Sequence, residues 1–460
     1  MTAIELKKAL ESAKHIHFIG IGGSGMFPLA QILHARGCYM TGSDNNETET
    51  LELVRKMGIT VFMGQRAENI EGADFICYTA AIMADNPELI AAKASGAVCV
   101  ERSELLGVLT MDTDNAICIS GTHGKTTTSG MTTQMLLASG FDTGAVLGGK
   151  LKAIGGSGRS GSDDMMVVES CEFVDTFLKL YPDIAVILNI DEDHLDYFKT
   201  LENLKKSFTR FASNAAKCLI YNGDDENTLD ALKTVDKSKF TFGRSRGNDY
   251  SYEILSTSGL DTRFQVYYRG EAVTEAVIHV PGEHNILNAL AAMAAARYMG
   301  AEWSGIVKGL DEFHGTVRRF EKIAQVKGVT IVDDYAHHPA EIRATLLAAK
   351  TLDFKRIVAV HQPFTYSRTS MLLDDFAEAL SIADKTVLTK IMGSREKNTY
   401  GIDSSRLQAK IEGCELTPEF DECVEYLVNN VREGDLVITM GCGDVYKVAK
   451  ALAKRLEMSK

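Results

Sequence analysis

The sequence predicts an α/β protein built from three domains in tandem. Short apolar runs alternate with longer segments of helical period almost throughout its 460 residues, which is the pattern of βαβ units and mostly parallel sheets. A chain of this length exceeds what one hydrophobic core of ordinary size accommodates. Polar stretches and changes of pattern place the domains at residues 1–112, 113–318 and 319–460.

The first domain is expected to open with a strand at His15–Ile21, a glycine turn and a helix. Four further apolar runs predict strands at Cys38–Gly42, Ile59–Met63, Phe75–Thr79 and Ala97–Val100. The turn Gly20-Ile21-Gly22-Gly23-Ser24-Gly25 satisfies GxGxxG, and Asp44 ends the next strand, where a ribose-binding acid is expected. These signals predict a Rossmann-like domain. Alone, they fit an NAD-dependent enzyme, a UDP-sugar binder or a turn without a ligand.

The second domain is expected to open with a strand at Ala116–Ser120, the loop Gly121-Thr122-His123-Gly124-Lys125-Thr126 and a helix. Glycines let the main chain approach phosphates at a helix N-terminus, a lysine neutralises the β- and γ-phosphates, and a hydroxyl reaches Mg²⁺. The strict pattern GxxxxGK[ST] is not met, because Ile119 stands where its first glycine would be. The strand–loop–helix context still predicts a P-loop-like ATP site.

Acidic and imidazole side chains follow two further expected strands, Met165–Val168 and Ile184–Leu188. Ligands of open α/β sheets bind beyond the carboxyl ends of the strands, so Glu169 and His194 are expected to face the phosphate loop. A carboxylate and an imidazole beside a triphosphate suit Mg²⁺, directly or through water. A histidine such as His194 taken singly is more often a polar loop residue than a ligand, but its place with Thr126 and Glu169 favours a metal ligand.

The remaining chain completes the predicted architecture. Gly155–Ser162 reads as a flexible surface loop. Tyr250–Val280 is expected to add a β-rich part, and a helix is expected from about Asn285 to Met299. The third domain is expected to form a second Rossmann-like, doubly wound sheet with strands at Val329–Asp333, Ile357–Val360, Thr386–Leu388 and Leu436–Thr439.

Composition narrows the class of protein. A net charge of −13, from 49 Lys and Arg against 62 Asp and Glu, argues against non-specific nucleic-acid binding. The nine cysteines are scattered without a CxxC, which is typical of a reducing compartment. Neither a secretory signal nor an apolar run of about 18 residues is evident. A cytoplasmic protein without a membrane partner is expected, as a monomer or a homodimer.

Taken together, the motifs resemble those of the Mur ligases, in the same order and over essentially the whole chain. The segments that carry the resemblance are Gly20–Met26, Gly121–Thr128, Glu169–Glu172, Asn189–Asp196, Pro281–Ala292, Val317–Glu321 and Asp333–Glu341. Gly22–Met26 and Asp334–Pro339 are similar to the members that join L-alanine to UDP-N-acetylmuramate.

The resemblance implies a role for each matching position. The UDP-substrate contacts would be Gly22, Gly23, Ser24, Gly25, Asp44 and His123, the last of these near the muramyl carboxylate. The ATP contacts would be Gly121, Thr122, His123, Gly124, Lys125, Thr126, Thr127, His284, Asn288, Arg319 and Asp334. Thr126, Glu169 and His194 would hold Mg²⁺, and Lys125, Glu169 and His194 would be the catalytic residues. Tyr335, His337 and Arg368 would face the amino acid.

The resemblance also implies the reaction and its cofactors, ATP and Mg²⁺. ATP would phosphorylate the lactyl carboxylate, and the amine of L-alanine would displace phosphate from the acyl phosphate. Catalysis would rest on positioning and charge stabilisation, with closure of the third domain as part of the cycle. The sequence departs from the family at Phe364 and Thr365, where a histidine and often a basic residue are usual, so strictness for alanine stays open. Ser170 stands where alanine is usual, and no lysine is assigned a carbamate.

Three alternatives remain beside this hypothesis. A dinucleotide-dependent oxidoreductase would use the turn Gly20–Gly25 but leaves Gly121–Thr126, Glu169 and His194 without a role. A non-catalytic binding protein for UDP-sugars or ATP would explain why Phe364 and Thr365 depart from the residues usual in the family. A sibling ligase would add a different amino acid or a preformed peptide.

Overall fold

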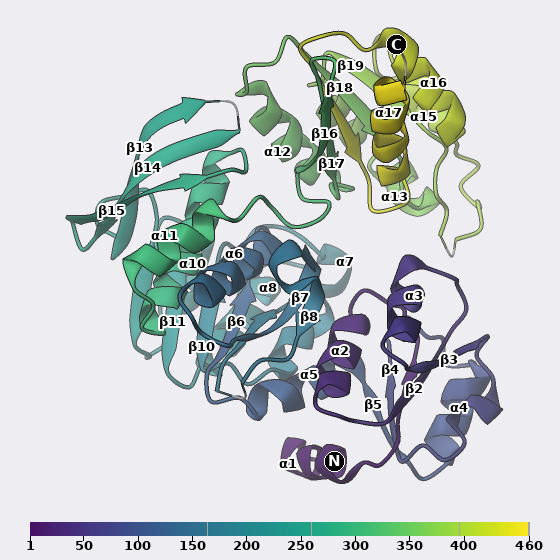
Figure 1. The fold of residues 1–460 in the computed structure, drawn as a ribbon, viewed down its shortest axis with the longest axis vertical. Helices are drawn as coiled ribbons and strands as arrows, with labels where there is room; N and C mark the ends of the chain where they lie inside the picture. The colour runs from purple at the N-terminus through teal and green to yellow at the C-terminus, as the bar shows by residue number, and fades with distance from the viewer. Residues whose placement is uncertain (163, 259, 395, 459–460) are drawn as a thin grey trace. The chain divides into compact units, whose positions relative to one another are not determined.

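The computed structural model describes residues 1–162, 164–258, 260–394 and 396–458. It contains three sheets with helices on their faces, which confirms the α/β architecture in three parts (Figure 1). The chain divides into two compact units. The first comprises Met1–Ile254, Phe264–Val277 and His284–Phe313, and the second comprises Leu255–Arg263, Ile278–Glu283 and the chain from His314 onward. The domain boundaries at residues 112 and 318 stay predictions.

The N-terminal sheet has five parallel strands in the order β3-β2-β1-β4-β5. Its strands are β1 (Ile16–Ile19), β2 (Met40–Asp44), β3 (Thr60–Met63), β4 (Phe75–Tyr78) and β5 (Val98–Glu101). The surrounding helices are α1 (Ala3–Ser12), α2 (Phe27–Ala35), α3 (Glu49–Lys56), η1 (Ala67–Ile70), α4 (Pro87–Ala94) and α5 (Arg102–Met111). One face packs on α2, α3 and α5, and the other packs on η1 and α4. This is the predicted Rossmann-like arrangement.

The central sheet has ten strands in the order β15-β14-β13-β12-β11-β10-β6-β9-β7-β8. Its strands are β6 (Ala116–Ser120), β7 (Gly144–Leu151), β8 (Gly156–Arg159), β9 (Met166–Glu169), β10 (Ile184–Ile187), β11 (Cys218–Asn222), β12 (Lys239–Phe242), β13 (Tyr250–Ser258), β14 (Asp261–Tyr268) and β15 (Glu271–Ile278). Its helices are α6 (Lys125–Ala138), η2 (Lys152–Ile154), η3 (Phe173–Lys179), α7 (Leu195–Phe198), α8 (Leu201–Ser213), α9 (Glu226–Leu232), α10 (Glu283–Tyr298) and α11 (Trp303–Asp311). Strands β10, β6, β9 and β7 run parallel, so the carboxyl ends of these strands meet at one edge of the sheet.

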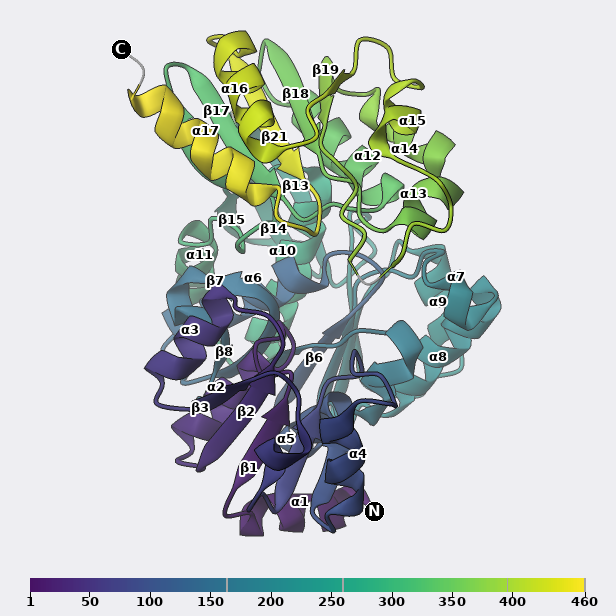
Figure 2. The ribbon, with the colours of Figure 1, turned by 90° about the vertical axis from the view of Figure 1, so that its right-hand side faces the viewer.

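The expectation that Gly155–Ser162 forms a surface loop is wrong. Residues Gly156–Arg159 form strand β8, which pairs antiparallel with β7. Helix α2 packs directly on β8, as Figure 1 and Figure 2 show, and the Gln31 side chain accepts a hydrogen bond from the Gly158 N–H at 3.1 Å. A Cβ on Gly158 would lie 2.5 Å from the Pro28 Cα. The glycines therefore allow two backbones to approach closely instead of making a loop flexible.

The C-terminal sheet has six strands in the order β16-β17-β21-β18-β19-β20 and is parallel except for β16. Its strands are β16 (Glu321–Val326), β17 (Val329–Asp334), β18 (Arg356–His361), β19 (Lys385–Leu388), β20 (Glu415–Leu416) and β21 (Asp435–Met440). Its helices are α12 (Pro339–Lys350), α13 (Tyr366–Met371), α14 (Leu373–Leu380), α15 (Ser404–Gln408), α16 (Phe420–Asn430) and α17 (Tyr446–Met458).

Alternating residues of the C-terminal strands supply two separate cores. In β18, Ile357 and Ala359 pack toward α12 and α14, whereas Val358 and Val360 pack toward α16 and α17. This period of two on a sheet covered on both faces produces the continuous apolar run seen in the sequence. Across the described ranges, no helix combines the length and apolar character that crossing a bilayer requires.

The contact between α2 and β8 yields a stability test. Because a methyl group at position 158 would overlap the Pro28 backbone, we expect Gly158→Ala to lose about 1–3 kcal/mol of stability. A thermal unfolding midpoint lower by several degrees is the measurable result. Gly247→Ala is the matched control, because no atom lies within 4 Å of the added Cβ. Equal midpoints for the two variants would contradict the close packing of β8 on α2.

Candidate functional site

The predicted phosphate loop lies between strand β6 and helix α6 of the first unit. Gly121 has φ +145° and Gly124 has φ +86°, and α6 begins at Lys125. Both glycines use backbone conformations that side chains disfavour. Thr122 and Thr126 are buried, His123 is exposed, and Thr127 is half-buried in the first turn of the helix. Main-chain N–H groups at a helix N-terminus are therefore available in the place where the sequence predicts a phosphate.

The Lys125 side chain, 15% exposed, folds back over its own loop. Its Nζ donates to the carbonyl oxygens of Gly121 at 2.6 Å and Thr122 at 3.1 Å, and to Glu172 Oε1 at 3.1 Å. Glu172 is 1% exposed. Burial by itself lowers the pKa of Lys125, but the Glu172 carboxylate opposes this effect, and the pKa is raised overall. The ammonium therefore stays charged inside the loop.

Asn189, which follows β10, fastens this loop to the neighbouring strand. Its Oδ1 accepts the His123 N–H at 2.8 Å, and its Nδ2 donates to the His123 carbonyl at 3.1 Å. The Asn189 carbonyl accepts the Thr122 N–H at 3.1 Å. The Thr122 hydroxyl also accepts the Asp191 N–H at 2.9 Å. Asn189 lies in one of the motifs of the sequence, but its role follows only from the paired strands, because they bring it to His123 and Thr122.

Of the three predicted metal ligands, Thr126 and Glu169 contact each other, whereas His194 contacts Glu172. The Thr126 hydroxyl donates to Glu169 Oε1 at 2.9 Å, and the Gly148 N–H donates to Glu169 Oε2 at 2.7 Å. A hydroxyl and a carboxylate oxygen side by side are donors that Mg²⁺ accepts together with water and phosphate oxygens. No three His, Cys, Asp or Glu side chains of the described residues form a ready metal cage. The donor set fits a metal that needs few protein ligands.

His194 lies beside Glu172 and an aromatic side chain. Its Nε2 is 3.9 Å from Glu172 Oε1, and its ring centroid is 4.7 Å from that of Phe173. Its backbone has φ +54°, an uncommon conformation for a residue with a side chain. The contact of His194 with a metal stays a prediction.

Helix α10 approaches the phosphate loop from the other side. A Cβ on Gly124 would overlap the Asn288 side-chain oxygen, so the backbone of the loop touches this helix. Asn288 Nδ2 donates to Asn285 Oδ1 at 3.0 Å. His284 lies exposed in the first turn of the same helix. The structure thus brings the Asn288 amide to the loop, and its place on the adenine side stays a prediction.

The N-terminal glycine loop lies at the carboxyl edge of the first sheet. Asp44 Oδ2 accepts the Gly22 N–H at 3.0 Å, and its Oδ1 accepts the N–H groups of Asn45 and Asn46. Gly23 is half-buried within the turn and Ser24 is exposed. Asp44, predicted as a ribose ligand, therefore anchors the loop by its main-chain amides.

Arg102, a residue missed by sequence reasoning, packs against the same loop. A Cβ on Gly25 would lie 3.1 Å from its Cδ and 3.2 Å from its Nε. Arg102 begins helix α5, directly after β5 at the same edge of the sheet. No pattern in the sequence predicts this contact, because nothing marks the residue after β5 as a neighbour of Gly25.

In the second unit, Asp334 ends β17 and is buried. It accepts the N–H groups of Phe320 at 2.8 Å and Ala336 at 2.7 Å. Burial raises the pKa of Asp334, and the Arg319 guanidinium opposes this shift. Arg319 lies over the Tyr335 ring, 5.4 Å from its centroid. Arg319, Asp334 and Tyr335 therefore lie together, and their contacts with the nucleotide and the amino acid stay predictions.

The three predicted amino-acid contacts also lie in this unit. His337 Nδ1 is 3.2 Å from Glu341 Oε2. Burial lowers the pKa of His337, and Glu341 opposes this effect. Arg368 is half-buried on α13, and its Nη1 has no hydrogen-bond partner within the described ranges. A buried guanidinium nitrogen without a partner is suited to receive a carboxylate. Glu341 ends one of the motifs of the sequence without an assigned role, because its contact with His337 depends on the turn before α12.

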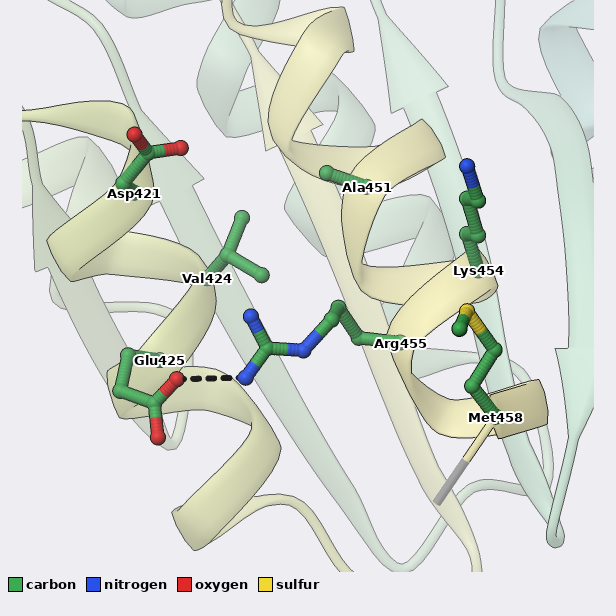
Figure 3. Close-up of a pocket in the computed structure, with 7 residues that line it drawn as sticks. All are labelled: Asp421, Val424, Glu425, Ala451, Lys454, Arg455 and Met458. Carbon is green, nitrogen blue, oxygen red and sulfur yellow. Dashed lines mark hydrogen bonds and ion pairs between the residues drawn. The ribbon is translucent and has the colours of Figure 1, made fainter.

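A surface groove between α16 and α17 lies apart from these residues (Figure 3). Its lining residues are Asp421, Val424, Glu425, Ala451, Lys454, Arg455 and Met458. Arg455 Nη2 lies 2.7 Å from Glu425 Oε2. None of the predicted site residues lines this groove.

The two hydrogen bonds between the Asn189 side chain and the His123 backbone give a structural test that needs no ligand. In Asn189→Ala, the His123 N–H loses the acceptor that it reaches at 2.8 Å. A lost hydrogen bond of about 1–1.5 kcal/mol corresponds to roughly tenfold faster amide exchange where opening is local. Hydrogen exchange at His123, read by mass spectrometry or NMR, measures it. Asn214→Ala at the C-cap of α8 is the control, and an unchanged His123 rate would contradict these hydrogen bonds.

Comparison with known proteins agrees with this geometry. Three family models match in order: the Mur ligase family catalytic domain at residues 15–112, the Mur ligase middle domain at 119–296 and the Mur ligase glutamate ligase domain at 318–443. The UDP-N-acetylmuramate–L-alanine ligase of Caldanaerobacter subterraneus subsp. tengcongensis is 44% identical, covering 96% of this chain and 97% of that protein. The enzyme of the same name from Acetivibrio thermocellus is 43% identical, with 97% of each covered.

Among solved structures, the UDP-N-acetylmuramate–alanine ligase of Thermotoga maritima superposes with a TM-score of 0.83 at 28% identity, covering 97% of this chain and 100% of that one. The similarity therefore extends from the glycine loop of the first sheet to the last strands of the third. Because matches in sequence and in structure run over nearly the whole chain, the protein belongs to the Mur ligase family.

Proposed function

We propose that this protein joins L-alanine to the lactyl carboxylate of UDP-N-acetylmuramate, with ATP converted to ADP and phosphate. The observation that carries the proposal is the loop after β6, where the Lys125 side chain, 15% exposed, folds over the loop and the Thr126 hydroxyl lies 2.9 Å from Glu169. Relatives that share 40–44% of their residues with nearly the full chain are named for this reaction. A soluble-phase, small-molecule reaction is also consistent with the acidic composition.

ATP and Mg²⁺ are the proposed cofactors. The N–H groups at the start of α6 suit the phosphates, and the Lys125 ammonium suits their charge. Thr126 and Glu169 would hold the metal, with His194 near them. When bound, Mg²⁺ would neutralise charge on the β- and γ-phosphates. Asn288 and His284 on α10 would receive the adenine side.

The reaction proceeds in two steps on this proposal. A lactyl carboxylate oxygen attacks the γ-phosphorus, and the bond to ADP breaks, which leaves an acyl phosphate. The amine nitrogen of L-alanine then attacks the acyl carbon, and phosphate leaves as the amide forms. Lys125 stabilises the charge that develops during phosphoryl transfer. No side-chain nucleophile is needed, so positioning of the reactants supplies most of the rate.

The two ends of the reaction are proposed to use different groups. The glycine loop Gly22–Gly25 and the adjacent Arg102 suit the diphosphate of the UDP part. Glycines let the main-chain N–H groups approach a phosphate closely, and an arginine pairs with phosphate oxygens. The half-buried Arg368 suits the alanine carboxylate, with Tyr335 and His337 nearby. A cytoplasmic location is part of the proposal.

A sibling ligase is the second candidate, because Phe364 and Thr365 lie in the chain segment that leads into Arg368. Thr365 has φ +63°, and its hydroxyl caps α13 by accepting the Arg368 N–H at 3.4 Å. These two residues thereby shape the helix that presents the guanidinium. Phosphate release measured with L-alanine, glycine, L-serine and dipeptides at fixed UDP-N-acetylmuramate separates the candidates. A preference for another acceptor would select the sibling reaction, and nucleotide binding without any turnover would select a binding protein.

Loss of the loop lysine tests the proposed ATP chemistry. We expect Lys125→Ala to reduce phosphate release by about 10³-fold or more, because a preorganised charge at the transferred phosphoryl group is removed. A coupled phosphate assay measures the rate, and circular dichroism confirms the fold. Lys308→Ala, an exposed lysine on α11, is the matched control. Full activity in the Lys125 variant would refute its role.

Arg368 tests the acceptor end separately. A lost charge-assisted bond of about 2–3 kcal/mol predicts a KM for L-alanine roughly 30- to 150-fold higher in Arg368→Ala, with the KM for ATP unchanged. Arg368→Lys keeps the charge without the planar fork and is expected to lie between. Arg406→Ala, which changes an exposed side chain on α15, is the control. Steady-state kinetics with varied alanine make the measurement, and an unchanged KM would remove Arg368 from the alanine site.

A further inference from the structure

Glu172 is a buried carboxylate for which the proposed reaction has no assigned role. It lies between β9 and η3, and its side chain is 1% exposed. Its two oxygens lie 3.0 and 3.1 Å from the Lys125 Nζ, and one of them lies 3.9 Å from His194 Nε2. It therefore touches Lys125 and His194, two residues that were predicted as catalytic.

The Lys125 ammonium has no hydrogen-bond donor left over. An ammonium offers three N–H donors, and here they reach the Gly121 carbonyl, the Thr122 carbonyl and Glu172. A phosphate that approaches Lys125 must therefore displace at least one of these acceptors.

Of the three acceptors, Glu172 is the one that can be given up. The two carbonyls belong to a backbone that is fastened: the Thr122 N–H donates to the Asn189 carbonyl at 3.1 Å, and the Thr122 hydroxyl accepts the Asp191 N–H at 2.9 Å. Glu172 Oε2, by contrast, has no hydrogen bond with good geometry in the described part of the chain. The carboxylate of Glu172 carries a negative charge, as a phosphate oxygen does. His194, 3.9 Å away, remains beside Glu172 when the carboxylate gives up the lysine.

We propose that Glu172 is a positioning residue that occupies the lysine in the ligand-free loop as a stand-in for phosphate and competes with the nucleotide for Lys125. This inference rests on the proposed nucleotide site. A buried ammonium without a counter-charge is unfavourable, so Glu172 keeps the empty loop in its folded form. The same carboxylate weakens nucleotide binding, because the phosphates must take the ammonium from it.

Glu172→Gln separates this role from a merely structural one. The amide keeps the shape but not the charge, so the thermal unfolding midpoint of the ligand-free variant is expected to fall by several degrees. Saturating ADP with Mg²⁺ should restore most of that loss, because the β-phosphate supplies the missing charge. The Kd for ADP, measured by calorimetry, is expected to tighten by about tenfold, because the phosphates no longer have to take the ammonium from a carboxylate that is 1% exposed. A merely structural carboxylate would lower the midpoint equally with and without ADP.

Two further variants complete the experiment. Glu192→Gln removes an exposed carboxylate from the loop after β10 and should leave both midpoint and Kd unchanged. In a Lys125→Met background, Glu172→Gln should no longer tighten ADP binding, because the effect acts through the lysine. Tightening that persists in this background would overturn the inference.

The outcomes distinguish this inference from the proposed function. Failure of the wild-type protein to bind ADP would contradict the nucleotide site itself. ADP binding by the wild type with an unchanged or weaker Kd in Glu172→Gln would overturn only the competition. Should the Gln variant not fold, Glu172→Asp serves instead. Its carboxylate is withdrawn by one methylene group, so the Kd for ADP is expected to tighten by a smaller factor. An unchanged Kd in this variant would overturn the proposal.

Discussion

A lysine ammonium enclosed by its own loop is the interaction on which the central site depends. Lys125 is 15% exposed, and a charge at that depth needs acceptors on every side. The backbone of Gly121 and Gly124 adopts positive φ, and the carbonyl groups of Gly121 and Thr122 accept hydrogen bonds from the ammonium. Asn189 and Glu172 then stabilise that turn from β10 and from the end of β9.

Carboxylates at strand ends share one task in all three sheets. Asp44 accepts the Gly22 N–H after β2, Glu169 accepts the Gly148 N–H after β9, and Asp334 accepts the Ala336 N–H after β17. Asp44 and Asp334 each hold a loop at the carboxyl edge of their sheet, where parallel strands place their ligand sites, and Glu169 bonds the backbone of the neighbouring strand β7. Acids that a sequence suggests as ligands are thus also supports for the backbone that would surround the ligand.

The glycines follow two different physical rules. Gly124 needs a left-handed conformation and also leaves room for the Asn288 side chain. Gly158 has ordinary strand geometry and needs only the absence of a Cβ, because the Pro28 backbone of α2 lies against it. Sequence reasoning recognised the first rule, since a Gly-Lys-Thr turn between strand and helix is distinctive. It mistook the second for loop flexibility, because a run of glycine and serine looks the same in either case.

The sequence by itself determined the α/β class, the three successive sheets, the central strands to within about two residues and the phosphate loop ahead of Lys125. These properties are local, since they depend on the period of apolar residues and on the spacing of glycine, lysine and hydroxyl groups within one segment. Only the tertiary structure decided that β8 is a strand against α2, that Arg102 meets Gly25 and that Glu172 meets Lys125. Those contacts join residues about 47 to 130 positions apart, and no local pattern encodes which strand ends become neighbours until the sheets have formed.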